Sequence, residues 1–221
     1  MMPPLNITRM NYDLARLRPE QLESYWDEKK PNHFPTGTFE HPGIWFELGA
    51  GTGWFFTSLA AQHPDKRLIA IERSRMRGRR LVQRCKRTGL ANILGFRGNA
   101  IGALVNEVPT ESLERLYILY PCPWLRNSQR KNRWYLHPLM KHFHRVLKPE
   151  GLMIWASDQE FYINEAEYVC RTQYNLKGLA WGQITPNPYN HLDQFPQGRT
   201  KFEFTFLQSG QPCYELIVTK S

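Results

Sequence analysis

Five short apolar segments alternate with segments of helical spacing along most of the chain. They are residues 44–48 (IWFEL), 67–72 (RLIAIE), 93–98 (ILGFRG), 113–121 (LERLYILYP) and 151–158 (GLMIWASD). This alternation predicts βαβ units and therefore a parallel sheet covered by helices. Two alternating segments, 200–208 (TKFEFTFLQ) and 213–220 (CYELIVTK), predict an antiparallel hairpin at the end. The predicted fold class is α/β, a doubly wound Rossmann-like sheet that is mostly parallel with an antiparallel C-terminal hairpin.

The length of 221 residues suits one such domain with a full core. Residues 1–41 are predicted to form a polar N-terminal arm, with a short helix over 18–30 and an irregular stretch over 31–39. Residues 42–221 are predicted to form the domain itself. Its expected helices are 53–62, 75–87, 100–107, 138–147 and 160–174, and a Pro/Asn-rich loop is expected over 185–198.

A glycine-rich turn follows the first apolar segment, in FELGAGTGWF. Gly49, Gly51 and Gly53 allow a tight turn and a close approach of the backbone to a ligand. A dinucleotide-binding turn would need Gly or Ala where Trp54 stands. The GxGxG spacing after the acidic Glu47 instead favours S-adenosylmethionine, whose sulfonium and amino groups are cationic. This version of the doubly wound sheet is typical of methyltransferases that use that cofactor.

The second apolar segment ends in a polar residue, Glu72, and another, Asn99, directly follows the third. Glu72 can accept hydrogen bonds from both ribose hydroxyls of the cofactor, and Asn99 can bind the adenine edge. The plain alternatives are a solvated strand end for Glu72 and an ordinary turn asparagine for Asn99.

The fourth apolar segment ends in Pro-Cys-Pro-Trp and continues into basic residues. Three stretches together, FELGAGTG, LYPCPWLRNSQRKNR and RTKFEF, resemble the bacterial tRNA (guanine-N7)-methyltransferases, with LKPEGLMIWASD and GLANI as weaker support. The resemblance extends from about Trp45 to Lys220. It implies methyl transfer from S-adenosylmethionine to N7 of a guanine in the tRNA variable loop, with S-adenosylhomocysteine as the product.

The resemblance also implies roles for single positions. Glu47, Glu72, Asn99 and Cys122 fall on the cofactor contacts. Cys122 lies at the reaction-centre position, and Asp158 matches an acid on the substrate side, so that these two are the catalytic candidates. The remaining positions that match substrate contacts are Arg126, Thr200, Lys201, Phe202 and Glu203.

This chain departs from the family pattern at the reaction centre. The family reads Pro-Asp-Pro-Trp-His-Lys, whereas this chain reads Pro-Cys-Pro-Trp-Leu-Arg, and Asn99 replaces a more usual Asp. Guanine N7 carries a lone pair and no proton, so its methylation requires alignment and no general base. Catalysis is therefore expected to survive, with slower turnover or an altered substrate.

Other interpretations remain open. Cys122 can be the nucleophile of a cytosine-C5 methyltransferase, in which a thiolate attacks C6, or an inert thiol in a tight turn. The turn also resembles the [Asn/Asp]-Pro-Pro-aromatic motif of amino-group methyltransferases, although a thiol is a poor acceptor. A relative that has lost catalysis and only binds RNA or cofactor is a further possibility.

The net charge of +9 favours a polyanionic partner, and the resemblance implies tRNA. One basic cluster lies over residues 73–87, which can be either an RNA contact or a solvent-exposed cationic helix face without a partner. A second cluster (Arg126, Arg130, Lys131 and Arg133) is interleaved with Trp124, Trp134 and Tyr135. The second cluster is the favoured RNA contact because it follows the reaction centre.

The four cysteines are scattered, with no CxxC pair and no His at ligand spacing. This pattern argues against a metal site and against a disulfide framework, and it suits a reducing cytoplasm. The sequence shows no membrane-spanning stretch and no signal peptide. Monomer and homodimer both remain possible.

Overall fold

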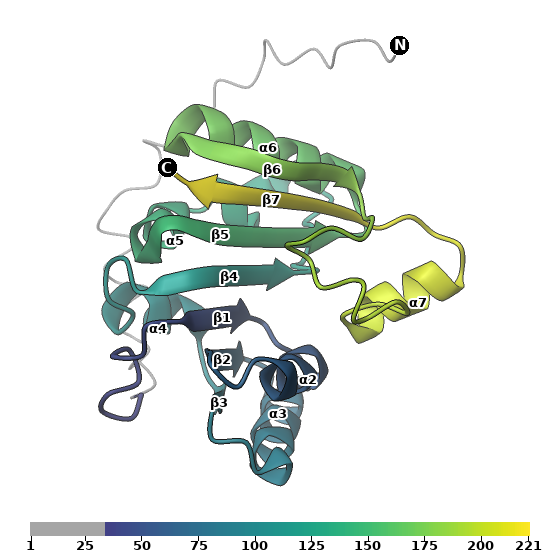
Figure 1. The fold of residues 1–221 in the computed structure, drawn as a ribbon. Coiled ribbons are helices and arrows are strands. Elements are labelled where there is room, and N and C mark those ends of the chain that lie inside the picture. The colour runs from purple at the N-terminus through teal and green to yellow at the C-terminus, as the bar shows by residue number, and fades with distance from the viewer. Residues whose placement is uncertain (1–33) are drawn as a thin grey trace.

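The computed structural model describes residues 34–221, which build one seven-stranded sheet with helices on both faces (Figure 1). The strand order is β3-β2-β1-β4-β5-β7-β6. Strands β1 to β5 pair in parallel, and β7 lies antiparallel between β5 and β6. The strand bounds are β1 Ile44–Leu48, β2 Arg67–Glu72, β3 Ile93–Arg97, β4 Leu113–Leu119, β5 Leu147–Ser157, β6 Leu176–Gln183 and β7 Tyr214–Lys220. The predicted fold class is confirmed.

The helices divide between the two faces of the sheet. Their bounds are α2 Trp54–Gln62, α3 Arg75–Thr88, α4 Ala100–Asn106, α5 Met140–Val146, α6 Glu160–Tyr174 and α7 Lys201–Gln208, with short 3-10 turns at Asn127–Asn132 and Trp134–Leu136. Residues of α4, α5 and α6 join one buried cluster with side chains of one face. Residues of α2 and α3 join a second cluster with the opposite face, to which Leu192 and Phe195 also belong. Because both faces are covered, the central strand β1 is buried at every residue.

The predicted antiparallel hairpin exists, but the prediction assigned its first strand to the wrong residues, 200–208. Residues 201–208 form helix α7, and the strand that pairs with β7 is β6. The alternation of Phe with polar residues suggested a strand, but Thr200 caps the helix by accepting a hydrogen bond from the N–H of Glu203 at 3.1 Å. Strand β6 was missed because it is the edge strand, has two glycines and buries only Leu176 fully.

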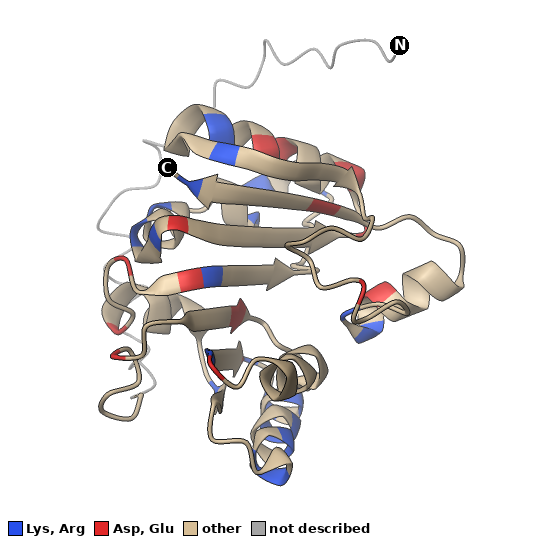
Figure 2. Ribbon diagram, in the orientation of Figure 1, with Lys and Arg blue, Asp and Glu red and all other residues tan. Residues whose placement is uncertain are grey.

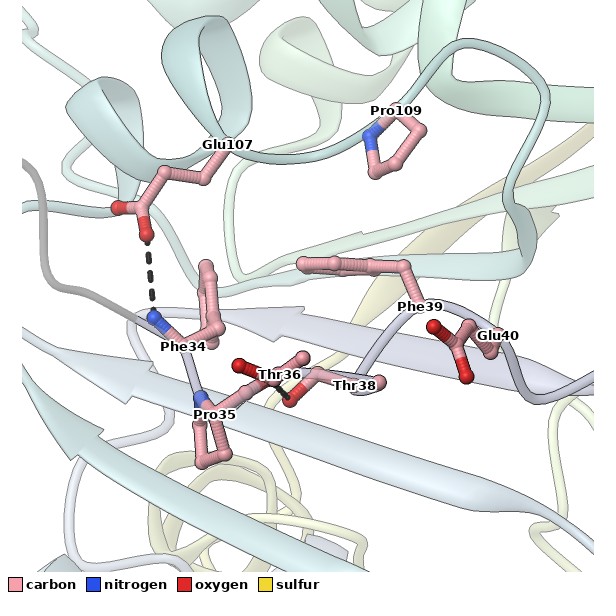
Figure 3. A pocket seen from close by; sticks show the side chains of 9 residues that line it. Phe34, Pro35, Thr36, Thr38, Phe39, Glu40, Glu107 and Pro109 are labelled. Carbon is pink, nitrogen blue, oxygen red and sulfur yellow. Dashed lines mark hydrogen bonds between the residues drawn. The ribbon is translucent and has the colours of Figure 1, made fainter.

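The predicted N-terminal arm lies mostly outside the described residues, including its expected helix over 18–30. Residues 34–39 form no helix or strand, as predicted. Phe34 packs edge-on against Phe39 and Phe96, with ring centroids 5.1 and 4.8 Å apart, and its N–H donates to Oε2 of Glu107 at 3.1 Å. Phe34, Phe39 and Glu107 border an open cavity of about 460 Å³ (Figure 3). It lies at the amino ends of the parallel strands, because its lining residues directly precede β1 and β4.

Candidate functional site

The glycine turn after β1 has the backbone conformation that its sequence predicts. Gly49, Gly51 and Gly53 have φ angles of 76°, 57° and 75°, a region that side chains other than glycine rarely adopt. A Cβ at Gly49 would meet no atom within 4 Å, whereas a Cβ at Gly53 would come within 2.3 Å of Cδ1 of Leu81. The turn is thus open on one side and packed tightly against α3 on the other. Open space beside its first glycine is what a bound ligand requires.

A second cavity, of about 550 Å³, opens at the carboxyl ends of the parallel strands, and we call it the carboxyl-end cavity. Among the predicted site residues it is lined by Gly49, Glu72, Asn99 and Cys122. Most of its other lining residues are apolar or aromatic, among them Leu48, Ile71, Ile101, Ile118, Leu119, Tyr120, Trp124 and Trp134. The polar ones are Arg73, Arg77, Asn132 and His137. Ligand sites of doubly wound sheets lie at this edge, and the volume is within the range of small-molecule pockets.

Glu72, the last residue of β2, is held in a fixed orientation at this cavity. The residue is 4% exposed. One carboxylate oxygen accepts the N–H of Gly51 at 3.0 Å, and the other accepts the N–H of Ser74 at 2.7 Å and pairs with Arg77 at 3.4 Å. The carboxylate therefore ties the glycine turn to the start of α3. A carboxylate accepts about four hydrogen bonds, so this orientation leaves capacity toward the cavity.

Glu47 lies in β1 and is only 3% exposed. Its burial, and to a lesser degree the charge of Glu72, raises the pKa of its carboxyl to about 8. Oε2 of Glu47 has no hydrogen-bond partner among residues 34–221. A buried acid without a partner, close to a second carboxylate, fits a site for a cationic group. Glu47 does not itself line the carboxyl-end cavity.

Asn99 lines the same cavity from the start of α4. Its side-chain oxygen accepts the N–H of Ile101 at 3.2 Å and so caps the helix. The cap fixes the side chain at the cavity wall. The helix-capping role and the predicted adenine contact are compatible, because the amide NH₂ of Asn99 is a separate donor group.

The Pro-Cys-Pro-Trp turn forms the rim of the carboxyl-end cavity. Cys122 is exposed and lines the cavity together with Tyr120 and Trp124. The turn begins and ends in left-handed backbone, since Tyr120 and Trp124 have φ angles of 52° and 48°. Such conformations in bulky residues store strain that the surrounding structure must offset.

Arg133 supplies that support from beneath the turn. It is 3% exposed, and its guanidinium donates to the carbonyl of Pro123 at 3.1 Å and to that of Trp124 at 3.0 Å. It also pairs with Glu165 of α6 at 2.8 Å. The prediction that Arg133 belongs to an RNA-facing cluster is wrong, because its donors are consumed inside the protein. Arg130 pairs with the same Glu165 at 3.0 Å.

A buried charge network joins α7 to this turn. Arg199, Glu203 and Glu215 are 0%, 0% and 2% exposed. Arg199 donates to Glu203 at 2.6 Å and to Glu215 at 3.3 Å. The hydroxyl of Tyr120 donates to Oε1 of Glu203 at 2.7 Å. Burial alone would raise the pKa of the Glu203 carboxyl, but the charge and hydrogen bonds of Arg199 lower it overall.

Sequence reasoning missed both Arg199 and Tyr120. The available signal was the i,i+4 spacing of Arg199 and Glu203 across the start of a helix. Glu203, predicted as a guanine contact, has its carboxylate occupied by Arg199 and Tyr120. The structure therefore shows it as the anchor of α7.

The other predicted substrate residues lie around the carboxyl ends of the strands. Lys201 and Phe202 are exposed at the start of α7, and the ring of Phe202 stacks on that of Tyr120 with centroids 6.0 Å apart. Asp158 follows β5 and accepts from the amide of Gln159 at 2.6 Å. Arg126 is exposed beyond the turn. The structure thus brings Phe202 to the rim residue Tyr120 but leaves Asp158 and Arg126 outside the cavity lining.

Comparison with known proteins identifies the family. The family model described as "Putative methyltransferase" matches residues 42–216. A tRNA (guanine-N(7)-)-methyltransferase from Rhizobium etli is 34% identical over 76% of this chain and 68% of its own length. The chain belongs to the tRNA (guanine-N7)-methyltransferase family. A bifunctional methyltransferase of Rickettsia felis is 29% identical over 79% of this chain, which spans about a third (34%) of that relative.

The sheet is that of the class I methyltransferases. The solved 16S rRNA methyltransferase KamB superposes with a TM-score of 0.61 at 16% identity, covering 86% of this chain and 95% of that one. Within residues 34–221, no helix has the length and apolar character needed to cross a membrane. In the same range, no group of three or more His, Cys, Asp or Glu side chains is placed to hold a metal ion.

Proposed function

We propose that this protein transfers a methyl group from S-adenosylmethionine to N7 of a guanine in tRNA, in the variable loop as the family resemblance implies. The proposal includes a cytoplasmic location, chemistry without a metal ion, and action as a monomer or a homodimer. It is supported by family membership and by the juxtaposition of two features. The glycine turn with its fixed Glu72 and the Pro-Cys-Pro-Trp turn border one cavity.

The residues at the cavity fit the cofactor, which supplies an electrophilic methyl group when bound. Gly49 leaves room for it, Glu72 would hold the ribose hydroxyls, and Asn99 would bind the adenine edge. Gly51 and Gly53 shape the turn. Glu47 would balance the positive charge, since its buried carboxyl ionises readily only when a cation is near.

The substrate side of the proposal involves the rim and α7. Cys122 and Asp158 are the proposed reaction-centre residues. Cys122 lies at the cavity rim, where the resemblance implies an Asp. Arg126, Thr200, Lys201 and Phe202 are the proposed contacts to the RNA. Glu203 would contribute by holding α7 in place, in keeping with its bonds to Arg199.

The missing Asp does not remove the basis for catalysis. Guanine N7 has a lone pair in the plane of the base and no proton to lose. The protein must therefore orient the base and exclude water, and no side chain has to accept a proton. The strained turn between Tyr120 and Trp124, held by Arg133, provides a rigid rim for that purpose.

The direct test is nucleoside analysis of tRNA incubated with the protein and isotope-labelled S-adenosylmethionine. The expected product is labelled 7-methylguanosine, and a tRNA lacking guanine in the variable loop is the matched control. Isothermal titration with S-adenosylhomocysteine tests the cavity separately. Failure of the cofactor product to bind would exclude every methyltransferase interpretation.

Two other outcomes would redirect the assignment. Labelled 5-methylcytidine, with a covalent adduct on RNA that contains 5-fluorocytosine and loss of both in Cys122→Ala, would indicate a cytosine-C5 enzyme. Binding of cofactor and tRNA without any labelled nucleoside would indicate a relative that has lost catalysis.

A further inference from the structure

Helix α3 carries an unusual concentration of positive charge on its exposed side. Residues 73–92 include no Asp or Glu, and the cations in this stretch are Arg73, Arg75, Arg77, Arg79, Arg80, Arg84, Lys86 and Arg87. All of these side chains are exposed. The helix buries Gly78, Leu81 and Cys85 on its other side, against the sheet. Figure 2 shows basic residues along the length of α3 and no acidic residue on it.

This arrangement is unfavourable for the isolated protein. Arg75 and Arg79, and likewise Arg80 and Arg84, stand four residues apart, where like charges destabilise a helix. The first turn has basic residues and no acidic one, so its charges also oppose the helix dipole. Within residues 34–221, the only ion pair that α3 makes joins Arg77 to Glu72. A polyanion lying along the helix would relieve both effects.

The basic surface is continuous with the candidate active site. Arg73 and Arg77 line the carboxyl-end cavity, and the rest of α3 leads away from it. The helix has 14 residues, which corresponds to roughly 21 Å at 1.5 Å per residue. Its cations recur along this length, as do the phosphates of a nucleic acid strand.

The second basic cluster, over residues 126–133, presents fewer exposed cations in the folded protein than its sequence suggests. Arg133 is buried under the Pro-Cys-Pro-Trp turn, and Arg130 pairs with Glu165. Only Arg126 and Lys131 of that cluster are exposed. The largest run of exposed cations beside the cavity is therefore on α3.

We propose that α3 is the docking surface for the sugar-phosphate backbone of the RNA whose guanine enters the carboxyl-end cavity. The inference rests on the proposed function, which supplies the RNA partner. Contacts of this kind fix the register and orientation of an RNA without selecting its sequence. They also make binding strongly dependent on salt, because each neutralised phosphate releases counterions.

The test compares two variants with equal loss of charge. The first carries Arg79→Gln, Arg80→Gln and Arg87→Gln on the outer side of α3. The control carries Lys141→Gln, Arg171→Gln and Lys177→Gln, which are exposed on α5, α6 and β6. Affinity for fluorescently labelled tRNA is measured by anisotropy at several salt concentrations. Titration with S-adenosylhomocysteine and a thermal melt verify that each variant is folded.

The α3 variant is expected to bind tRNA about tenfold more weakly or worse at low salt. The slope of log Kd against log salt should fall by about two, since each lost phosphate contact contributes roughly 0.7–0.9. The control should keep the slope of the wild type, and both variants should bind S-adenosylhomocysteine normally. The thermal midpoint of the α3 variant should be unchanged or higher, because repulsion along the helix is reduced.

Equal effects of the two variants on affinity and slope would overturn the proposal. Unchanged tRNA binding with lost binding to anionic phospholipid vesicles would overturn it as well, by assigning the surface to a membrane. The proposed function is tested independently. Binding of tRNA that depends on α3 but yields no labelled nucleoside would support this surface while refuting the methyl transfer. An α3 variant that methylates tRNA and binds it as tightly as the wild type would support the methyl transfer and refute the α3 surface.

Discussion

Replacing Arg199 by Ala would leave two buried carboxylates without their counter-ion. The guanidinium donates to Glu203 at 2.6 and 3.0 Å and to Glu215 at 3.3 Å, and all three side chains are almost completely buried. Removing one partner of such a buried pair destabilises a protein by about 3–5 kcal/mol. For a chain of 221 residues, this corresponds to a fall in Tm of roughly 6–20 °C.

The loss of stability should depend on pH in a defined direction. In the wild type the pKa of Glu203 lies below its ordinary value of 4.5, so its contribution is present at neutral pH and is lost as the pH falls through the folded pKa. In Arg199→Ala, burial would raise that pKa, so the variant becomes less stable as the pH rises above about 4.5. The difference between the two proteins should therefore grow from about pH 5 to pH 7.

Urea unfolding followed by far-UV circular dichroism measures both effects. Arg171→Ala is the control, because its ion pair with Glu167 is at an exposed Arg side chain (59%) and should contribute about 0.5 kcal/mol or less. The double variant Arg199→Met, Glu203→Gln should recover part of the loss, since it removes the unpaired charge at Glu203 but leaves that at Glu215. A loss in Arg199→Ala no larger than that of the control, or one independent of pH, would refute the assignment of Arg199 as the counter-ion of α7.

Three further substitutions test the candidate site. The free energy of unfolding of the wild type should fall as the pH rises from about 4.5 to about 8, because the buried carboxyl of Glu47 ionises there, and Glu47→Gln should lack this fall. In urea unfolding, the stability of the variant relative to the wild type should therefore increase toward pH 8. Parallel pH profiles of the two proteins would contradict the raised pKa. Glu72→Gln should weaken S-adenosylhomocysteine binding by about ten- to a hundredfold in isothermal titration, because the hydrogen bonds it would make to ribose involve a charged acceptor, and an unchanged Kd would exclude the ribose contact. Cys122→Asp should leave the rate of 7-methylguanosine formation unchanged or higher, and a strong loss in nucleoside analysis would show that the thiol itself is needed.

Several features of the site followed from local sequence alone. The GxGxG sequence predicted the tight backbone turn, because the left-handed conformation of Gly49, Gly51 and Gly53 depends on residue type more than on distant contacts. Glu72, Asn99 and Cys122 were predicted at one cavity because the carboxyl ends of neighbouring parallel strands meet at one edge.

Other features could not be inferred from the sequence because they depend on contacts between distant segments. The period-two pattern of residues 200–208 predicted a strand, whereas the helix cap at Thr200 and the buried pair of Glu203 with Arg199 accompany a helix. Arg133 was predicted to contact RNA, but its guanidinium lies beneath the Pro-Cys-Pro-Trp turn and forms hydrogen bonds inside the protein. A sequence gives the charge of a side chain but not its exposure.

The order of residues by itself determined the α/β class, the glycine turn and the edge of the sheet at which the site forms. These follow from periodicity and from the conformational range of single residues, which act over a few positions. The tertiary structure alone decided which cations face solvent and which are held inside. It also decided that Tyr120 and Glu203, 83 positions apart, share one hydrogen bond. Burial and pairing of charge depend on segments that meet only when the chain is folded.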